Sequence, residues 1–343
     1  MDLECPSFLE EMNRSRQLIV TTVRSFTVLL VAAVCAYGQL KSNEVSERPA
    51  VAFETRGVLH LATISGHILK TIKITPEIGT FAIAPDAEKI LFSSAGKTLN
   101  SYGGQLYLMS LSNPVAKLRT HGPYYNKKPR PQEVYSDPDF APDGKRAVFS
   151  IHSQPTGDLV EASGPFATIN LRTGAVSVLA STLHVPGEAW GTAFAGNAYW
   201  SGDGQRILLN FEDGFSLTDP EGKTLEEVAL PLTDSEWTSS LGWIGSECIV
   251  FIGGKDYADA QKNSAQFLNL KTHKSGSLAT LLQLKEEQVT GLVAISGAVR
   301  VRRQGSELLV ESGDYRWKIP DSDSRTQVRI VPVVPSEAPT SCR

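Results

Sequence analysis

The chain has little of what cofactor, metal and hydrolase chemistry requires. It carries no P-loop, no dinucleotide-binding fingerprint, no CxxCH haem motif and no GxSxG nucleophile elbow. Its six histidines are scattered, without the HxH, HExxH or Cys/His spacing that a zinc site needs. The sequence therefore predicts no catalytic residue, no metal ligand and no cofactor, and it favours a protein that is not an enzyme.

A strong net charge is also missing. The 343 residues sum to a formal charge of −4, which is too small to attract nucleic acid or an anionic membrane through the global field. We therefore expect no nucleic-acid partner. Amphipathic helices are missing as well; the one candidate, residues 278–289, is preceded by Ser and Gly and favours a short turn.

Cysteine is rare, with four residues in the chain. Cys5 and Cys35 lie in the N-terminal segment, so its removal would leave Cys248 and Cys342. In an exported chain these two cysteines allow one disulfide that ties the C-terminal tail to a late strand. The alternative is that Cys248, followed by an apolar Ile-Val-Phe run, is a buried strand residue.

The N-terminus has the pattern of a targeting segment. Arg14, Arg16 and Arg24 precede the apolar run FTVLLVAAVCA (26–36), which has the length of a signal-peptide core and is too short to span a membrane. Small residues follow where signal peptidase requires them. We expect residues 1–38 to be a signal peptide that exports the chain to the periplasm or the medium, or an uncleaved signal that anchors it in the membrane.

The most informative feature that is present is a repeated hairpin. The segment SDPDFAPDGKRAVFS (136–150) recurs in weaker form as FAIAPDAEKILFSS (81–94), AYWSGDGQRILLNFEDG (198–214) and LGWIGSECIVFIGG (241–254). In the better copies the two strands are joined by a tight turn in which glycine takes the position with φ > 0. In the turn Pro85-Asp86-Ala87-Glu88 this glycine is replaced by alanine, so we expect strain or another turn type there.

Units of about forty residues with four short strands each are typical of β-propeller blades. Six such units lie at 49–75, 79–119, 135–180, 192–230, 239–281 and 289–319. The first unit lacks a strand, and we expect residues 326–334 to complete it, because a closed ring leaves no free edge. The predicted fold is all-β: a six-bladed propeller of four-stranded antiparallel blades at 49–334, between a linker at 39–48 and a flexible tail at 335–343.

The repeat resembles the TolB-type, WD40-like propeller repeat, in which Ser-Pro-Asp-Gly is followed by Lys or Arg and an apolar strand. The match is best at Ser136, Pro138, Phe140, Pro142, Asp143, Gly144, Lys145 and Arg146. The resemblance implies the propeller fold and, by family analogy, envelope association and partner proteins; it transfers no activity. TolB has a domain ahead of its propeller that residues 39–48 are too short to supply, and the hydrolase domain of prolyl-type peptidases is also missing. We therefore expect a stand-alone relative.

Loop lengths distinguish the two faces of the predicted ring. The hairpins after the first and third strands of each blade emerge on one face, named here the hairpin face, and the other connections emerge on the opposite loop face. The hairpin face receives only tight turns, whereas the long insertions 95–104, 119–134, 152–165, 181–191 and 253–264 all fall on the loop face. Loops longer than the fold needs are usually functional or disordered, so we expect the binding site on the loop face.

The most distinctive insertion, residues 120–135, combines aromatic and basic side chains with three prolines. Its predicted binding residues are Tyr124, Tyr125, Lys127, Lys128 and Arg130. Tyrosine and arginine are enriched at interface hot spots, because they supply contact area and hydrogen bonds together. The loop therefore predicts a contact with a protein or peptide; the alternative is a solvated loop whose tyrosines pack on the rim.

Two further aromatic residues, Trp190 and Tyr257, fall in other loop-face segments and complete the set of predicted binding residues. Asp137 and Asp139, by contrast, are assigned to turn and strand-start hydrogen bonds within the repeat. The sequence thus predicts an exported, monomeric, non-enzymatic scaffold that holds a protein or peptide partner in the periplasm or cell envelope. The alternatives are a lactonase-, lyase- or glycosidase-type propeller enzyme with its site in the central channel, and a carbohydrate-binding module that uses aromatic residues of the loop face.

Overall fold

The computed structural model describes residues 48–95, 104–120, 133–153, 162–179, 197–211, 214–229, 237–254 and 264–331. The chain divides into two units, Met1–Arg48 and Pro49–Arg343, and the strands of the described residues belong to the second. Within the described ranges, no helix has the length and apolar character needed to cross a membrane.

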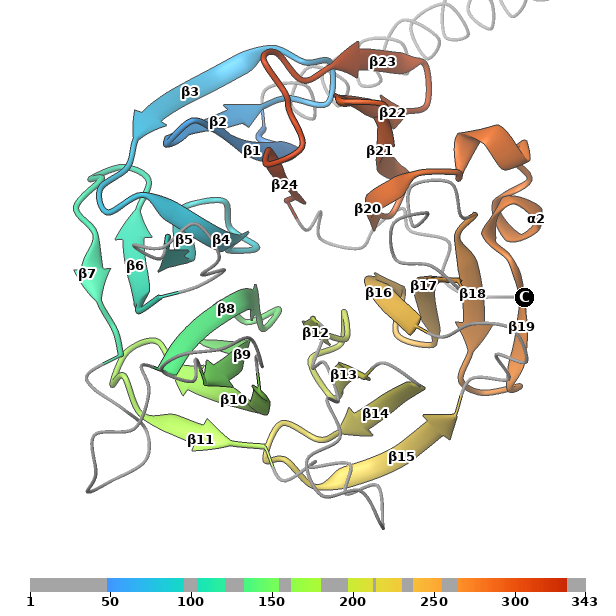
Figure 1. The fold of residues 1–343 in the computed structure, drawn as a ribbon, viewed down its shortest axis with the longest axis horizontal. Helices are drawn as coiled ribbons and strands as arrows, with labels where there is room; N and C mark the ends of the chain where they lie inside the picture. The colour runs from blue at the N-terminus through green and yellow to red at the C-terminus, as the bar shows by residue number, and fades with distance from the viewer. Residues whose placement is uncertain are drawn as a thin grey trace, which may run out of the picture. The chain divides into compact units, whose positions relative to one another are not determined.

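The second unit is a six-bladed β-propeller of four-stranded antiparallel sheets, as the repeat predicts (Figure 1). Blade 1 contains β24 (Gln327–Ile330), β1 (Val51–Thr55), β2 (Val58–Ala62) and β3 (Ile68–Lys73), and blade 2 contains β4 (Ile78–Ile83), β5 (Lys89–Ser94), β6 (Leu106–Ser110) and β7 (Lys117–Leu118). Blade 3 contains β8 (Glu133–Phe140), β9 (Arg146–Ser153), β10 (Ala162–Asn170) and β11 (Val176–Val178), and blade 4 contains β12 (Ala198–Trp200), β13 (Ile207–Phe211), β14 (Gly214–Thr218) and β15 (Thr224–Ala229). Blade 5 contains β16 (Trp237–Ile244), β17 (Cys248–Gly254), β18 (Gln266–Asn269) and β19 (Lys274–Ser277), and blade 6 contains β20 (Leu292–Ser296), β21 (Val299–Gln304), β22 (Glu307–Ser312) and β23 (Tyr315–Lys318).

The first strand of each blade is the innermost one, next to the central axis (Figure 1). The C-terminal strand β24 pairs with β1 and becomes the innermost strand of blade 1, which confirms the predicted closure. Trp317 of blade 6 reinforces this closure, because its indole nitrogen donates a hydrogen bond to the carbonyl oxygen of Ile64 at 3.1 Å. Gly66 is required beside it: a Cβ there would lie 2.8 Å from the indole ring, and φ is +89°.

Apolar packing between blades holds the ring together. The buried apolar side chains form six clusters, each with members from two adjacent blades. Phenylalanine provides much of this packing: the rings of Phe166 and Phe211 meet edge to face across the interface of blades 3 and 4, and those of Phe215 and Phe251 do the same across blades 4 and 5. Each fully buried phenylalanine contributes about 1.5–3 kcal/mol through removal of its surface from water.

The hairpin turns have the conformations that the sequence predicts. Gly144 and Gly204 lie at φ +64° and +69°, and Ala87 is forced to φ +56°, where an L-residue with a Cβ is strained. In each of these turns the preceding aspartate, Asp86, Asp143 or Asp203, accepts a hydrogen bond from the backbone N–H two residues later, at 2.9–3.0 Å. The repeated Asp therefore fixes the turn.

Successive hairpins also contact one another around the hairpin face. The Cβ position of Gly204 lies 3.5 Å from Pro142 in the hairpin of the preceding blade. The guanidinium of Arg146 lies over the ring of Trp200, 4.9 Å from its centre, and Arg206 repeats this contact on Trp243 at 5.5 Å. These cation–π contacts join blade 3 to blade 4 and blade 4 to blade 5.

The segment 278–289 forms a short helix and not a long one. The helix α2 (Leu278–Leu282) has five residues, with the hydroxyl of Ser277 capping its N-terminus, and a 3₁₀ turn follows at Glu286–Gln288. Nearby, Cys248 of β17 is fully buried and disulfide-bonded. The interpretation of Cys248 as a buried strand residue is confirmed. The predicted pairing with Cys342 stays a prediction, because the other cysteines lie outside the described residues.

Candidate functional site in the central channel

The loop residues predicted to bind a partner all lie outside the described residues. They are Tyr124, Tyr125, Lys127, Lys128, Arg130, Trp190 and Tyr257. The structure therefore does not test their role. It instead reveals a second candidate site, which the sequence analysis did not identify residue by residue.

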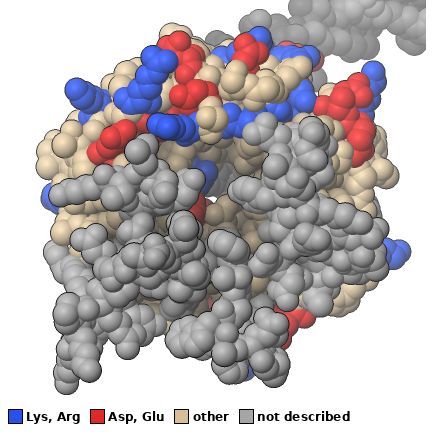
Figure 2. All heavy atoms as spheres, viewed as in Figure 1, with Lys and Arg blue, Asp and Glu red and all other residues tan. Residues whose placement is uncertain are grey.

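This site is a pocket of about 230 Å³ in the central channel. It is lined by Thr80, Asp137, Asn197, Val293, Arg303, Thr326, Gln327, Val328 and Arg329. Most of these residues belong to innermost strands or immediately precede them. Figure 2 shows the hollow at the centre of the ring, with acidic and basic atoms at its border.

The pocket lies toward the loop-face end of the channel. In blades 2 to 6 the innermost strand runs into a turn of the hairpin face, so its first residues are at the opposite end. β24 also begins at that end, because Gln327 pairs with Glu54 near the end of β1, where β1 turns into β2. Asn197 directly precedes β12, Thr326 directly precedes β24, and Thr80 is the third residue of β4. This end of the channel is the one that belongs to the predicted loop face.

β-Bulges direct several of these side chains into the channel. Four innermost strands lose their regular register with the second strand of the blade near the pocket: β4 between Ile78 and Phe81, β8 between Ser136 and Asp139, β16 between Ser240 and Gly242, and β20 between Leu292 and Ala294. The lining residues Thr80, Asp137 and Val293 lie in three of these irregularities. Bulges re-aim side chains and are common next to functional sites.

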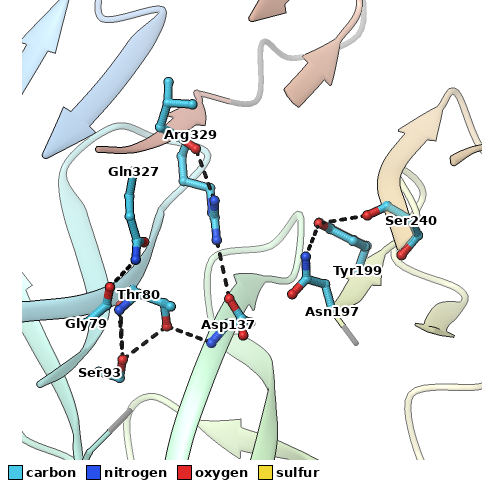
Figure 3. Close-up of polar contacts among 10 residues, drawn as sticks. Gly79, Thr80, Ser93, Asp137, Asn197, Tyr199, Ser240, Gln327 and Arg329 are labelled. Carbon is cyan, nitrogen blue, oxygen red and sulfur yellow. Dashed lines mark hydrogen bonds and ion pairs between the residues drawn. The ribbon is translucent and has the colours of Figure 1, made fainter. Parts of the chain in front are cut away.

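Asp137 is the centre of the polar network in Figure 3. It has φ +49° within the bulge of β8, and its backbone N–H donates to the hydroxyl of Thr80 at 2.7 Å. Its carboxylate oxygen lies 3.7 Å from a terminal nitrogen of Arg329. Blades 1, 2 and 3 are thereby connected through one residue, Asp137, that no turn of the repeat requires.

Ser93 positions Thr80 through two contacts. The hydroxyl oxygen of Ser93 lies 3.0 Å from the hydroxyl of Thr80 and accepts a hydrogen bond from the backbone N–H of Thr80 at 2.9 Å. Gln327 of β24 donates through its side-chain amide to the carbonyl oxygen of Gly79 (Figure 3). The other amide atom, Oε1 of Gln327, is buried without a hydrogen-bond partner among the described residues. An unpaired buried acceptor costs about 1–3 kcal/mol, and the wall of the pocket contains one that its own described residues leave unpaired.

Tyr199 forms the opposite side of the network. Its hydroxyl accepts a hydrogen bond from the amide nitrogen of Asn197 at 3.0 Å and donates to the carbonyl oxygen of Ser240 at 3.3 Å (Figure 3). Burial raises the pKa of Tyr199 to about 12, so the phenol stays protonated at physiological pH. Tyr199 is therefore a fixed neutral hydrogen-bonding group that orients Asn197 at the pocket wall.

Asp139, two residues after Asp137, links two blades. Its carboxylate accepts a hydrogen bond from the backbone N–H of Trp200 at 2.8 Å. Burial raises the pKa of Asp139 to about 7, while the bond from Trp200 and the positive charge of Arg329 act in the opposite direction. The assignment of Asp137 and Asp139 to hydrogen bonds within the repeat is thus incomplete: Asp137 faces the channel, and Asp139 joins blade 3 to blade 4.

The sequence contains a signal for this site that was not recognised. Thr80, Asp137, Asn197 and Ser240 each lie three residues before a large apolar or aromatic residue, which stands two positions ahead of the first turn residue Pro85, Pro142, Gly202 or Gly245 and is Ile83, Phe140, Trp200 and Trp243 respectively. Aligning the repeats on those positions places one polar residue from each of blades 2 to 5 in the same column. An isolated polar residue in a strand indicates little, but four at one repeat position indicate a common environment.

The chain matches no protein-family model and no curated protein sequence. Three solved structures are similar at low identity. U3-55K aligns with a TM-score of 0.43 and 10% identity over 68% of this chain and 61% of that chain, and the RRP9 WD40 repeats align with 0.44 and 9% over 68% and 60%. An oligogalacturonate lyase in complex with manganese aligns with 0.46 and 11% over 77% and 70%. The chain covers about 60% of the length of the first two structures.

Proposed function

We propose that the chain is an exported, non-enzymatic binding protein, a stand-alone TolB-like propeller that holds a protein or peptide partner on its loop face. The observation that carries this proposal is the set of bulges that places Thr80, Asp137 and Val293 at the loop-face end of the channel. These bulges give the ring a recessed centre on the face that also receives the long insertions.

The chemistry of the pocket favours binding. Its polar lining consists of hydroxyl, amide and guanidinium groups with one carboxylate, Asp137, which is paired with Arg329. Such groups recognise polar ligands through hydrogen bonds. The predicted loop residues Tyr124, Tyr125 and Lys127 would add contact area around the opening.

The disulfide-bonded state of Cys248 supports the proposed export. Disulfides persist in the periplasm and outside the cell and are rare in reducing compartments. The apolar segment 26–36, preceded by arginines, supplies a signal of the expected kind.

The proposal is tested by affinity capture from native envelope extract with three baits. The first is the wild-type chain, and the second carries Tyr124→Ala, Tyr125→Ala, Lys127→Ala and Lys128→Ala. The control bait carries alanine at four exposed lysines of the hairpin face, Lys145, Lys223, Lys271 and Lys274. We expect one protein that the wild type and the control bait recover and the loop variant loses. Equal recovery on all three baits would contradict the proposed loop-face contact.

A further inference from the structure

The charged groups in the pocket do not balance. Among the nine lining residues, Arg303 and Arg329 are cationic and Asp137 is the sole anion. The two arginines come from neighbouring blades: Arg329 is on β24, the innermost strand of blade 1, and Arg303 is on β21, the second strand of blade 6. The lining therefore has an excess of one positive charge, which favours an anionic ligand.

Arg329 is only partly engaged by the protein. One terminal nitrogen donates to the carbonyl oxygen of Val328 at 3.0 Å, and the other lies 3.7 Å from the carboxylate of Asp137. Charge-assisted hydrogen bonds are shorter, about 2.7–2.9 Å, so Asp137 does not satisfy the guanidinium fully. With 31% of its side chain exposed, Arg329 retains N–H groups that a ligand in the pocket can reach.

The charge of Arg303 is also only partly compensated by the protein. Its guanidinium donates to the backbone carbonyl oxygen of Asp323 at 2.8 Å. Burial lowers the pKa of Arg303, and the negative charge of Asp323 offsets this only in part. A negative group in the pocket would compensate for the remaining cost of burying this charge.

A hydrogen-bond acceptor completes the arrangement. Asn197 uses its amide nitrogen to donate to Tyr199, and Figure 3 shows its amide oxygen turned away from that hydroxyl. This oxygen suits an N–H or O–H of the ligand. The pocket volume of about 230 Å³ is below the roughly 300–1,000 Å³ of pockets for drug-sized ligands, so it fits one small group or the last residue of a chain.

We propose that this pocket binds a carboxylate that has a hydrogen-bond donor, an amide N–H or a hydroxyl, close to it. Arg303 and Arg329 bind the carboxylate, and Asn197 accepts from the donor. This chemistry is found in the free C-terminus of a peptide and in small hydroxy acids. The inference deepens the proposed function and rests on it for the nature of the partner, but the pocket chemistry can be tested separately.

The first test is calorimetric titration of the full chain at low ionic strength with four probes. They are N-acetyl-trialanine with a free C-terminus, the same peptide with a C-terminal amide, lactate and acetate. We expect the free acid to bind and the amide to show no binding, and lactate to bind more tightly than acetate. A peptide preference identifies the C-terminus as the source, and a preference for lactate identifies a small acid. Equal binding of the free-acid peptide and the amide peptide would overturn the proposal, and so would the absence of binding by both the free-acid peptide and lactate.

Two variants change the affinity in opposite directions. Arg329→Gln should weaken binding of the carboxylate probe about tenfold or more, because it removes a charged hydrogen bond. Asp137→Asn should strengthen it severalfold, since it removes the competing anion, and asparagine tolerates the φ of +49° at this position. The matched control is Arg325→Gln, an exposed arginine outside the pocket, which should leave the affinity unchanged.

The Asp137→Asn variant keeps the test decisive even if Arg329→Gln fails to fold. Weaker binding in Asp137→Asn, or equal losses in Arg329→Gln and Arg325→Gln, would overturn the carboxylate site. If carboxylate selectivity is absent while partner capture still depends on Tyr124 and its neighbours, the site is wrong and the scaffold function stands. If the selectivity is present and capture is indifferent to the loop, the scaffold function fails and the site stands.

Discussion

The two ends of the innermost strands follow different rules. At the hairpin end, the same residues recur from blade to blade: Asp143 and Asp203 fix their turns in the same way, and Arg146 and Arg206 stack on tryptophans of the next blade. At the channel end, the shared position holds threonine, aspartate and asparagine in blades 2, 3 and 4, and all three side chains line the pocket. Repeated residues support the ring, whereas residues that differ at one repeated position form the pocket.

This difference has a physical basis. Neighbouring blades face the same local problem of making a tight turn and contacting the next blade, so one solution can be reused, as in blades 3 and 4. The channel is a single shared space, and a pocket within it needs different groups from different blades. The comparison predicts that changes at the hairpin end alter stability, while changes at the channel end alter ligand affinity.

The largest expected effect concerns Asp139, which connects the two regions. The pKa of an aspartate in the unfolded chain is about 3.9, whereas that of Asp139 in the folded chain is about 7. Between these values the folded state binds more protons, so its stability falls as pH rises from about 4 to about 7 and then levels off. The difference corresponds to at most about 4 kcal/mol.

Asp139→Asn should remove this pH dependence, because asparagine mimics the protonated acid and still accepts from Trp200. Urea unfolding at pH 5 and pH 8 measures it: we expect the variant to be more stable than the wild type at pH 8. Asp143→Asn, in an exposed turn, should keep the wild-type dependence. If the free energy of unfolding falls between pH 5 and pH 8 by the same amount in the wild type and in Asp139→Asn, the assignment is wrong.

The next effect is at the hairpin end. Gly144→Val places a β-branched residue at φ +64° and should lower the free energy of unfolding by about 1–3 kcal/mol. Urea unfolding of the full chain measures the loss, and Lys145→Val in the same turn is the control, which should change the stability much less. The carboxylate affinity of any folded Gly144→Val protein should equal that of the wild type; a loss would show that the two ends are coupled.

A smaller effect is expected for the contact of Arg146 with Trp200. Arg146→Gln should cost about 0.5–1 kcal/mol, since the guanidinium lies 4.9 Å from the ring centre and is partly exposed. A double-mutant cycle with Trp200→Leu isolates the interaction. Additive losses in the cycle would show that the stacking contributes nothing.

The smallest effect should be a gain. Ala87→Gly relieves a strained φ of +56°, which outweighs the entropic cost of glycine, and should raise the free energy of unfolding by about 0.5–1 kcal/mol. Glu88→Gly, at the next position of the same turn, has no such strain to relieve and should be destabilising. Thermal unfolding of the two variants side by side distinguishes them, and equal shifts would refute the strained turn.

Much of the fold follows from local rules in the sequence. Proline, aspartate and glycine at fixed spacing give the turns, the spacing gives six blades, and the missing strand of the first unit is supplied by β24. Local rules even identify a strained turn, the one at Ala87. The burial of Cys248 within a strand also agrees with one interpretation of its apolar neighbours in the sequence.

The residues of the pocket were not predicted, and Asp137 shows why. In the sequence it stands among the residues of a turn motif, and its neighbours explain it well enough. Its bulged conformation depends on the register between β8 and β9, and its partners Thr80 and Arg329 belong to other blades. No pattern within one repeat contains that information.

The sequence by itself determined the repeated unit, because turns and strand alternation depend on residues that are close along the chain. The tertiary structure decided which of the unrepeated polar residues meet. Closure of the ring brings Gln327 to Gly79 and Arg329 to Asp137, pairs that are about 190 to 250 positions apart in the chain. Those contacts exist only once all six blades have packed, and the pocket is a property of the closed ring.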